Sequence, residues 1–401
     1  MALPLDGIRI LDLTSVVLGP YATMTLADMG AEIVKVEAPD GDMVRNIGAG
    51  RNPKMGPMHL SYNRGKRSLA IDLKADAGKK AFLRLVATAD ALVHNMRPQA
   101  MKGLGLDYDS IRKIKPDIVY CGAYGFGSAG PYAAKAAFDD VIQGASGIAS
   151  LMSAISDRPS FAPMVVADKT TGLMLACCTL AALVDRARTG RGRFVEVPMF
   201  ETMVSYTMVE HMWQATFVPP AGPAGYPRVM TKERRPHRTK DGWVSILPHS
   251  TENWRDFFAM GGRPQLGDDP RFADLALRTK HATEIYAIVS EIAATKTTGE
   301  WLALCDAKSI PCTKVNSVQE LFDDPHLKAV GMFGEVEHPS EGKIRNIRAP
   351  FAFGEEPKEP KRQAPRLGEH SIEILREAGL DGSEIDALIS AKIVIQTERF
   401  S

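Results

Sequence analysis

Cysteine, aromatic residues and an excess of either charge are all scarce in this chain. Its 401 residues include five cysteines, 7% aromatic residues and a formal net charge of only +1. The cysteines lack the CxxC spacing of metal sites, so we expect no bound metal, and their odd number favours reduced thiols in the cytoplasm. Neither nucleic acid nor a membrane surface is an expected partner, because both favour a strong basic excess.

The sequence also lacks a long apolar run and a basic leader. No run approaches the roughly 20 apolar residues that span a bilayer. The first residues, MALPLDGIRILDL, lead directly into a strand pattern, so we expect no signal peptide. A content of 45% hydrophobic and 24% charged residues is typical of a soluble globular protein, and the length predicts two or three domains.

Strand and helix patterns alternate through the first 125 residues. The predicted strands are 8–14, 32–38, 68–73, 91–95 and 117–124. The predicted helices between them are 20–31, 77–90 and 108–115. This alternation predicts an α/β fold with a parallel sheet and crossover helices. Ligands of such sheets bind beyond the carboxyl ends of the strands.

The composition changes sharply at residues 217–242, which are rich in proline and glycine and then basic. We interpret this stretch as a linker between a first domain, 1–216, and a smaller one, 243–329. The smaller domain has a strand pattern in WVSILPH and helical patterns at 251–260, 281–294 and 298–306. From 330 to 401 the chain is expected to return to the first domain and to include a capped helix.

The segment GFGSAG, at 125–130, has the spacing of a dinucleotide-binding turn. Such a turn must open directly into a helix, whereas Pro131 and Tyr132 follow here. The acidic residues Asp139 and Asp140 come too early to bind a ribose. The segment is therefore predicted to be an ordinary turn, and a nicotinamide cofactor is not expected.

Basic residues flank two of the predicted strands of the first domain. They are Arg64, Lys66, Arg67, Lys74, Arg97 and Lys102. Any one of them is more often a solvated surface residue than a ligand contact. Together they could offer positive charge at one sheet edge to a phosphorylated ligand.

A lone carboxylate, Asp168, lies between an apolar run and a long helical pattern that ends at Gly190. Its position predicts a helix N-cap, in which the carboxylate accepts backbone N–H groups. Arg186 and Arg188 fall in the last turn, where cations suit the helix dipole. The local pattern alone favours this structural role.

Several segments, taken together and in order, resemble the family III CoA-transferases. They include PLDGIRILDLTSVVLGPYATMTLADMGAEIVKVEAPDGD, NRGKRSLAIDLK, YGFGSAGPY, VVADKTTG, TGRGRFVEVPMFE, SIPCTKVNSVQELFDDPHLKAVGMF, EVEHPSEGKIR and APRLGEHSIEIL. The resemblance implies a Rossmann-like large domain built from both ends of the chain, a smaller α+β domain between them, and an interlocked homodimer. It implies no tightly bound cofactor, with coenzyme A entering as the acyl-CoA donor and a carboxylic acid as acceptor.

The resemblance places the family's catalytic carboxylate at Asp168. It implies that Asp168 attacks an acyl-CoA thioester to give an aspartyl anhydride, and then carries CoA as an aspartyl thioester. A helix N-terminus would favour the ionised form of this carboxylate.

The resemblance also transfers a set of CoA-contacting positions. They are Val17, Ile71, Asp72, Leu73, Lys74, Asn95, Met96, Arg97, Lys102, Lys135, Phe138 and Asp139. Three positions depart from formyl-CoA transferase: Ala38 and Gly103 replace basic contacts, and Val17 replaces a polar residue near the acyl group. Lys102, the residue before Gly103, is expected to compensate for the second change. The segment ILPH at 246–249 replaces a glycine-rich flap, which leaves His249 as a candidate substrate contact or a structural residue.

Two other functions remain open. An alpha-methylacyl-CoA racemase needs a second base, yet Phe138 stands where that branch has a histidine. A degenerate member of the family could bind acyl-CoA without turnover. Overall the segments are more similar to the succinyl-CoA-dependent dicarboxylate transferases than to the oxalate enzymes, and the acyl donor and acceptor stay unassigned.

Overall fold

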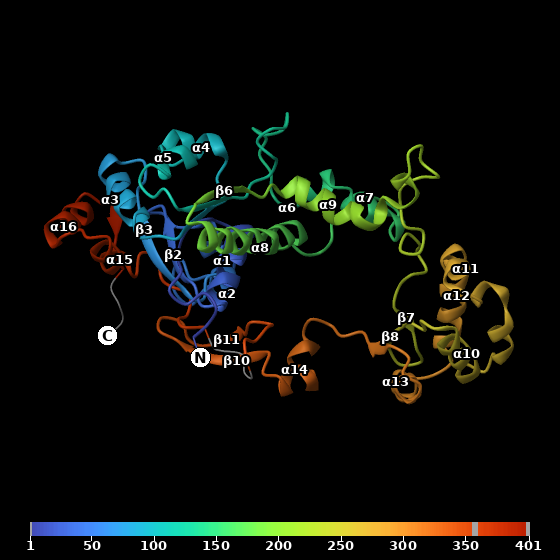
Figure 1. The fold of residues 1–401 in the computed structure, drawn as a ribbon. Coiled ribbons are helices and arrows are strands. Elements are labelled where there is room, and N and C mark those ends of the chain that lie inside the picture. Colours follow the sequence, from blue (N-terminus) through green and yellow to red (C-terminus); the bar gives the residue numbers. More distant parts are fainter. Residues whose placement is uncertain (1, 355–359, 398–401) are drawn as a thin grey trace. The chain divides into compact units, whose positions relative to one another are not determined.

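The computed structural model describes residues 2–354 and 360–397, and the chain divides into two compact units (Figure 1). The first unit contains the described parts of Met1–Ser146, Pro163–Ser205 and His326–Ser401. The second unit contains Gly147–Ala162 and Tyr206–Pro325, so residues 217–242 are part of it.

The first unit is built on a seven-stranded sheet of order β12-β3-β2-β1-β4-β5-β6. The strands are β1 (Arg9–Leu13), β2 (Glu32–Glu37), β3 (Lys66–Ile71), β4 (Ala91–His94), β5 (Val119–Gly122), β6 (Arg193–Glu196) and β12 (Val394–Ile395). All neighbours are parallel except β12, which pairs antiparallel with β3. The parallel strands follow the doubly wound order. The predicted α/β fold with a parallel sheet is confirmed, and β3 begins two residues earlier than predicted.

Helices cover both faces of this sheet. The helices of the first unit are α1 (Leu18–Asp28), α2 (Pro57–Tyr62), α3 (Asp76–Val86), α4 (Pro98–Leu104), α5 (Tyr108–Ile111), α6 (Asp139–Ala145), α8 (Val166–Thr189), α15 (Ser371–Glu377) and α16 (Gly382–Ser390). Two more helices, α9 (Met199–His211) and α14 (Pro325–Ala329), each have residues in both units. Helices α3, α15 and α16 lie on one side of the strands and α8 on the other (Figure 1).

Alternation along β1 assigns its side chains to these two faces. Leu11 and Leu13 belong to a buried cluster with Phe82 of α3 and Leu375 of α15. The side chain of Asp12 points the other way and accepts a hydrogen bond from Thr23 of α1. The apolar face therefore closes the core, and the opposite face carries a buried charge beneath α1.

Helix α8 packs closely against α1, and a glycine makes this approach possible. A Cβ atom at Gly172 of α8 would lie 2.6 Å from the carbonyl oxygen of Leu18, the first residue of α1. Because α1 begins just after β1, the start of α8 lies beyond the carboxyl ends of the strands. Ligands of such sheets are expected at this end of the strands.

Helix α8 is also long and apolar enough to cross a membrane, and 44% of its most apolar window is buried. The sequence has no uninterrupted apolar run here, because polar residues are scattered along α8. Buried positions in α8 include Leu175, Ala176 and Thr179, the last against Cys121 of β5. Its burial against α1 and β5 is that of a core helix.

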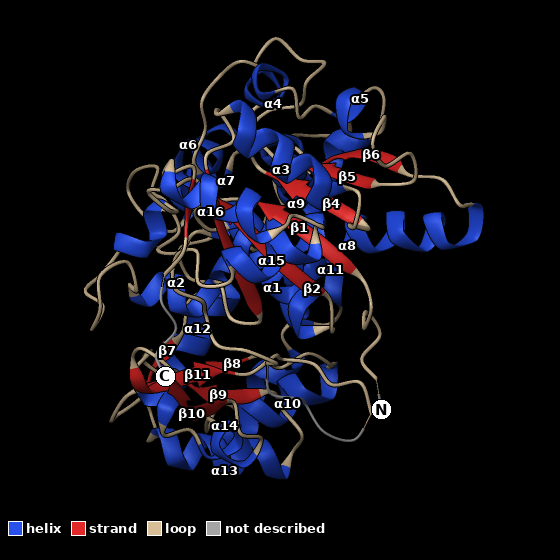
Figure 2. Cartoon of the chain, turned by 90° about the vertical axis from the view of Figure 1, so that its left-hand side faces the viewer, coloured by secondary structure: helices blue, strands red, loops and turns tan. Residues whose placement is uncertain are grey.

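The second unit contains a small antiparallel sheet and a helical cluster (Figure 2). Its strands are β7 (His237–Arg238), β8 (Trp243–Ile246) and β9 (Cys312–Lys314). Its helices are α7 (Ile148–Leu151), α10 (Thr251–Met260), α11 (Leu275–Lys280), α12 (Ala282–Ala293) and α13 (Thr298–Ala307). Its core is aromatic, with Trp254, Phe257, Phe258, Phe272 and Trp301 in one cluster. The predicted strand at 243–249 and the helices at 251–260, 281–294 and 298–306 are confirmed.

The C-terminal segment completes the first unit. Strands β10 (Phe333–His338) and β11 (Gly342–Ile347) form an antiparallel hairpin, and α15 follows where a capped helix is predicted, although its N-cap residue His370 makes no side-chain capping bond. Helix α16 and the edge strand β12 are not predicted. Short 3₁₀ turns complete the chain: η1 (Met43–Asn46), η2 (Met152–Ala154), η3 (Trp213–Thr216), η4 (Pro264–Asp268), η5 (Pro270–Phe272) and η6 (Glu320–Phe322).

Candidate active site

Asp168 is the third residue of α8 rather than its N-cap. The helix begins at Val166, and the N-cap residue Val165 makes no side-chain capping hydrogen bond. The N-cap prediction for Asp168 is therefore wrong, because the helical backbone starts two residues before the carboxylate. The predicted end at Gly190 is confirmed, with the glycine in the left-handed conformation at φ 70°.

A second aspartate supplies the missing cap. Asp139, the first residue of α6, accepts the backbone N–H of Asp168 on its Oδ2 atom at 2.9 Å. Its Oδ1 atom accepts a hydrogen bond from Gln143, whose amide also donates to the carbonyl of Met164 at 3.2 Å. Asp139 and Gln143 thus fix the first turn of α8 from another helix. No local signal in the sequence marks Gln143, which lies one helical turn after Asp139.

The carboxylate of Asp168 is buried and has no cationic partner. Asp168 is 9% exposed, and its side chain has no hydrogen bond or ion pair with any residue in 2–354 and 360–397. Burial and, secondly, the nearby charge of Asp139 raise the pKa of Asp168 to about 7. The expectation that the helix N-terminus favours ionisation is wrong in its net effect, because desolvation and a like charge outweigh the dipole.

Two tyrosines lie near this carboxylate. The rings of Tyr21 in α1 and Tyr62 in α2 pack edge to face with centroids 6.1 Å apart. Burial and the charge of Asp168 raise the pKa of Tyr62, so its phenol stays neutral. Sequence patterns single out neither residue, since Tyr21 lies in an ordinary helical pattern and Tyr62 in no predicted element.

The loop between β1 and α1 is held in an unusual backbone conformation. Val16 has φ 69°, which is costly for a β-branched residue. Its N–H donates to both carboxylate oxygens of Asp42, at 3.1 and 3.2 Å. Asn95 braces the same loop, accepting from the Ser15 N–H at 3.0 Å and donating to the Ser15 carbonyl at 2.8 Å. Val17, the N-cap residue of α1, is buried.

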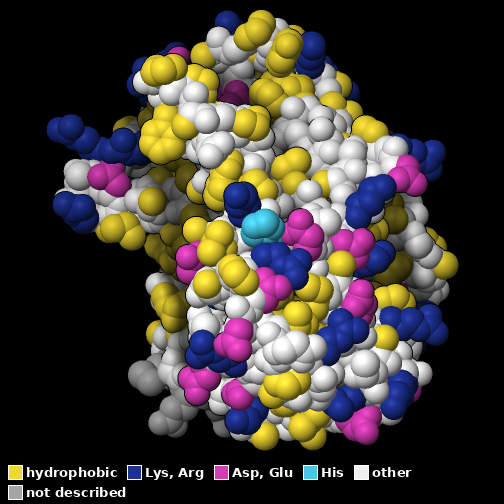
Figure 3. Space-filling view, turned by 90° about the vertical axis from the view of Figure 1, so that its right-hand side faces the viewer, with side chains coloured by type: hydrophobic (Ala, Val, Ile, Leu, Met, Phe, Trp, Pro, Cys, Tyr) yellow, Lys and Arg dark blue, Asp and Glu magenta, His cyan; other side chains and the backbone are white. Residues whose placement is uncertain are grey.

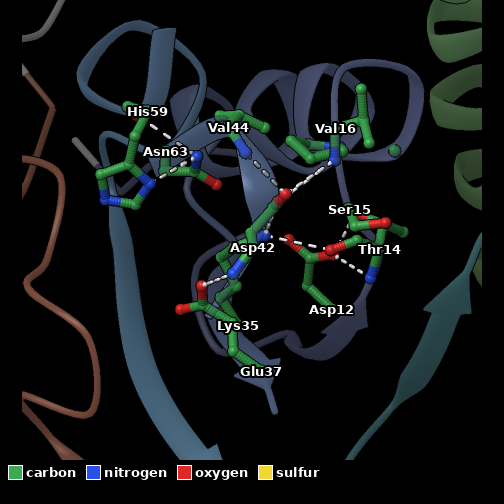
Figure 4. A network of polar contacts seen from close by, with 12 residues as sticks. Asp12, Thr14, Ser15, Val16, Lys35, Glu37, Asp42, Val44, His59 and Asn63 are labelled. Atoms are coloured by element: carbon green, nitrogen blue, oxygen red, sulfur yellow. Dashed lines mark hydrogen bonds and ion pairs between the residues drawn. The ribbon is translucent and has the colours of Figure 1, made fainter. Parts of the chain in front are cut away.

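Buried ion pairs between strand residues and nearby aspartates hold this loop in place. Lys35 forms an ion pair with Asp42 at 3.0 Å, and Figure 4 shows Asp42 between Lys35 and the backbone of Val16. Lys66 pairs with Asp12, also at 3.0 Å, and all four of these side chains are almost completely buried. Asp12 in turn accepts the backbone N–H of Thr14. The network therefore connects three strands, β1, β2 and β3, to the loop that enters α1.

Three of the basic residues expected at the ligand edge are used in this way instead. Lys66 is held by Asp12, Arg64 pairs with Asp28, and Arg67 pairs with three glutamates. The prediction that they offer charge to a phosphorylated ligand is wrong, because carboxylates on the sheet, α1 and α15 already neutralise them. The side chains of Lys74, Arg97 and Lys102 remain exposed.

A pocket of about 270 Å³ opens at the carboxyl ends of β1, β2, β3 and β4. The predicted CoA-contacting residues in its lining are Ile71, Asp72, Leu73, Lys74 and Met96. Ala38, which stands where formyl-CoA transferase has a basic residue, lines the pocket as well. The strand ends thus gather five residues from two separate segments into one concavity.

The remaining predicted contacts lie outside that lining. Arg97 donates to the carbonyl of Ala134 at 3.3 Å, and the Lys135 ammonium lies 3.8 Å from the ring centroid of Tyr132. Phe138, the residue before α6, is 63% exposed. Arg97 therefore connects the turn after β4 to the loop that leads to Asp139. Lys102 lies in α4.

GFGSAG forms bends and turns between β5 and α6, as predicted. A Cβ at Gly127 would lie 2.5 Å from a carboxylate oxygen of Glu201, which accepts the Gly127 N–H at 3.0 Å. The glycine there serves a close contact with α9. The motif opens no helix, so it lacks the geometry of a dinucleotide turn.

His249 lies in the second unit, in the loop after β8. Its side chain is exposed, and its backbone carbonyl accepts a hydrogen bond from Arg278 at 3.4 Å.

Among the described residues, no group of three His, Cys, Asp or Glu side chains could hold a metal ion. On the face drawn in Figure 3, basic and acidic side chains are interspersed, in agreement with the net charge of +1.

Fold and site together define a doubly wound α/β protein with a pocket at its strand ends and a desolvated carboxylate at a helix start. The model of CoA-transferase family III matches residues 5–371. The chain belongs to this family and is an enzyme of the CoA-transferase class.

Relatives with assigned names cover nearly the whole chain. Succinate–glutarate CoA-transferase of Agrobacterium fabrum is 33% identical over 385 residues, which cover 93% of this chain and 95% of the relative. Succinyl-CoA:glutarate CoA-transferase of Homo sapiens is 30% identical and covers 98% of this chain and 91% of its own. Formyl-CoA:oxalate CoA-transferase of Streptomyces avermitilis is 32% identical, with 98% and 100% covered.

Solved structures share the fold. Rv3272 of Mycobacterium tuberculosis aligns with a TM-score of 0.80 and 31% identity, covering 92% of this chain and 99% of that one. A CAIB/BAIF family protein of Brucella suis aligns with a TM-score of 0.79 and 29% identity, covering 94% and 100%.

Proposed function

We propose that this protein transfers CoA between carboxylic acids with Asp168 as the nucleophile. The observation that carries the proposal is a carboxylate that is buried, has no ion pair in the described chain and has a pKa near 7. A carboxylate stripped of water and of hydrogen bonds is more nucleophilic than a solvated one. Its position on the first turn of α8 leaves its oxygens free while its backbone is fixed by Asp139.

The reaction proceeds without oxidation or reduction. An oxygen of ionised Asp168 attacks the thioester carbon of the donor, the C–S bond breaks, and CoA leaves as a thiolate. The thiolate then attacks the Asp168 acyl carbon of the mixed anhydride, and the donor acid leaves as a carboxylate. The acceptor carboxylate attacks the acyl carbon of the resulting aspartyl-CoA thioester, the C–S bond breaks, and CoA leaves again as a thiolate. This thiolate attacks the acceptor carbon of the second anhydride, which forms the product acyl-CoA and releases Asp168 as a carboxylate.

CoA occupies the pocket at the strand ends in this proposal. Ile71, Leu73 and Met96 offer apolar surface, while Lys74 at its rim is exposed and has no ion pair within the described residues. Arg97 and Lys102 add positive charge nearby in the chain. These cations are suited to the phosphate groups of CoA.

A dicarboxylic acid is the proposed acceptor, and succinyl-CoA the proposed donor. Support comes from relatives that are 30–33% identical over almost the whole chain and whose names specify succinate and glutarate. The formyl-CoA:oxalate relative is about as similar to this chain, at 32% identity. The choice of a dicarboxylic acid over oxalate therefore rests also on residues 246–249, which contain no glycine where oxalate enzymes have a glycine-rich flap.

An interlocked homodimer in the cytoplasm completes the proposal. Helix α8 exposes Leu173, Met174 and Val184, apolar side chains that a second chain would cover. The five cysteines are free, which suits a reducing compartment. Light scattering of the purified protein tests the dimer: a monomer mass would overturn that part.

A transfer assay tests the function. Purified protein is mixed with succinyl-CoA and glutarate, and glutaryl-CoA is followed by chromatography, with Asp168→Asn as the matched variant. We expect transfer in the wild type and a loss of about 10³-fold or more in the variant. Exchange of the α-proton of a 2-methylacyl-CoA in D₂O without transfer would identify a racemase. Binding of acyl-CoA with neither reaction would identify a non-catalytic binder.

A further inference from the structure

A second pocket is lined entirely by residues of the second unit. Its volume is about 120 Å³, and its lining comes from the loop after β8, from α10, α11 and α12, and from residues near 226–228. One water needs about 10–15 Å³ of such space, so the pocket admits a molecule of several heavy atoms.

Two arginines line this pocket, and neither has an acidic partner. Arg228 donates to the Tyr286 hydroxyl at 3.2 Å, and Arg278 donates to the carbonyls of Phe272 at 2.8 Å and His249 at 3.4 Å. No ion pair of either arginine occurs among residues 2–354 and 360–397. Arg228 also has a side-chain hydrogen bond with Tyr226. A guanidinium has about five N–H donors, so each residue keeps several that a ligand can use.

Two other arginines of this unit have acidic partners and serve for comparison. Arg263 pairs with Glu291 at 2.8 Å, and Arg271 pairs with Asp269 at 2.7 Å. Neither of them lines the pocket. Both guanidiniums that face the cavity thus have no carboxylate partner among the described residues, which leaves the negative charge to be supplied by a ligand.

The rest of the wall is apolar. Trp254, Ile285 and Tyr286 are each less than a tenth exposed, and Leu247 contributes further aliphatic surface. A ligand that satisfies both parts has an anionic end for the guanidiniums and a short apolar body for this wall. A short-chain carboxylic acid has that chemistry, and its size agrees with the volume.

We propose that this pocket of the second unit binds the carboxylate of a short aliphatic acid, held by Arg228 and Arg278 against a wall formed by Trp254 and Ile285. The choice of ligand class rests on the proposed function, which makes such acids the molecules that this enzyme exchanges. The acid bound there is either the acceptor itself or an effector, and the experiment below distinguishes the two.

The test measures binding by calorimetry to the full chain carrying Asp168→Ala, so that no chemistry occurs. Succinate, glutarate, butyrate and inorganic phosphate are titrated in turn. We expect saturable binding of at least one acid and a weakening of about tenfold or more in Arg228→Gln and in Arg278→Gln. Arg263→Gln is the matched control and should bind like the parent. Binding of phosphate but of no acid would overturn the inference, as would equal affinity in all variants.

A second measurement uses the wild type and does not depend on how the variants fold. Phenylglyoxal modifies accessible arginines, and peptide masses report the extent at each. Saturating acid should protect Arg228 and Arg278 but not Arg263, and absence of protection would overturn the inference.

Kinetics then separate the two roles. If the acid is the acceptor, Arg228→Gln raises the KM for the acceptor while formation of the Asp168 adduct with CoA is unchanged. If it is an effector, the KM is unchanged and added non-substrate acid alters the rate in the wild type only. Failure of adduct formation in the wild type would contradict the proposed function, whereas loss of protection alone contradicts only the pocket.

Discussion

The backbone N–H of Asp168 donates to the Oδ2 atom of Asp139 at 2.9 Å. One aspartate thus holds the backbone of the other and, through its charge, disfavours ionisation of the other's side chain. Asp139 therefore has two separable effects on Asp168, one geometric and one electrostatic.

The electrostatic effect predicts a pH profile. Because the ionised form of Asp168 is the nucleophile and its pKa is raised to about 7, kcat/KM should rise with pH and level off above about 7. In Asp139→Asn the amide oxygen can still accept the Asp168 N–H, but the like charge is gone. The acid limb should move to lower pH. An unchanged limb would show that Asp139 does not set this pKa.

Stability should respond in the opposite sense. The ordinary pKa of 3.8 describes the unfolded chain, so between about 4 and 7 the folded state binds more protons at Asp168 and loses stability as pH rises. At pH 8 the cost is at most about 4 kcal/mol, and less because the side chain keeps some solvent. Asp168→Asn should therefore unfold at higher denaturant than wild type at pH 8, with little difference at pH 4. Equal unfolding midpoints of wild type and Asp168→Asn at both pH values would contradict the conclusion that burial raises the pKa of Asp168.

The CoA pocket predicts a selective loss of substrate affinity. Lys74→Ala and Arg97→Ala should each raise the KM for acyl-CoA by about three- to tenfold with a smaller change in kcat, since phosphate contacts bind ground and transition states alike. Steady-state kinetics with a fixed acceptor measures this. Lys80→Ala, an exposed lysine of α3 outside the pocket, is the control and should leave the KM unchanged.

The buried ion pair predicts a large structural cost. Lys66→Met leaves Asp12 without its cation at 0% exposure, which should lower the free energy of unfolding by about 3–5 kcal/mol. Lys74→Met, at an exposed position, should change it by less than about 0.5 kcal/mol. Denaturant titrations of both variants provide the comparison, and similar midpoints would mean that the pair contributes little.

Features that depend on neighbouring residues could be predicted from the sequence, whereas contacts between residues far apart in the chain could not. The strands and helices of the sheet follow from alternation, because side-chain period reports local burial. The pairing of Lys66 with Asp12 does not, since its partner is 54 residues away and a lysine beside a strand is usually solvated. β12 has only two residues, too few for a period of two to be visible.

The site shows the same division. Asp168 could be singled out from its neighbours and from the resemblance, and five of the CoA-contacting positions share one pocket. Asp139 is among the predicted contact positions, but its hydrogen bond to the Asp168 N–H could not be predicted, because it joins two helices that are far apart in the sequence. Tyr62 likewise comes from another helix. The cap was assigned to Asp168 from local pattern, whereas a residue 29 positions earlier provides it.

The most direct measurement is the intact mass of the protein after mixing with succinyl-CoA alone. A covalent thioester at Asp168 should add the mass of CoA less one water, be released by hydroxylamine, and be absent in Asp168→Ala. An adduct that persists in Asp168→Ala, or no adduct with succinyl-, acetyl- or propionyl-CoA, would contradict the assignment of Asp168 as the nucleophile.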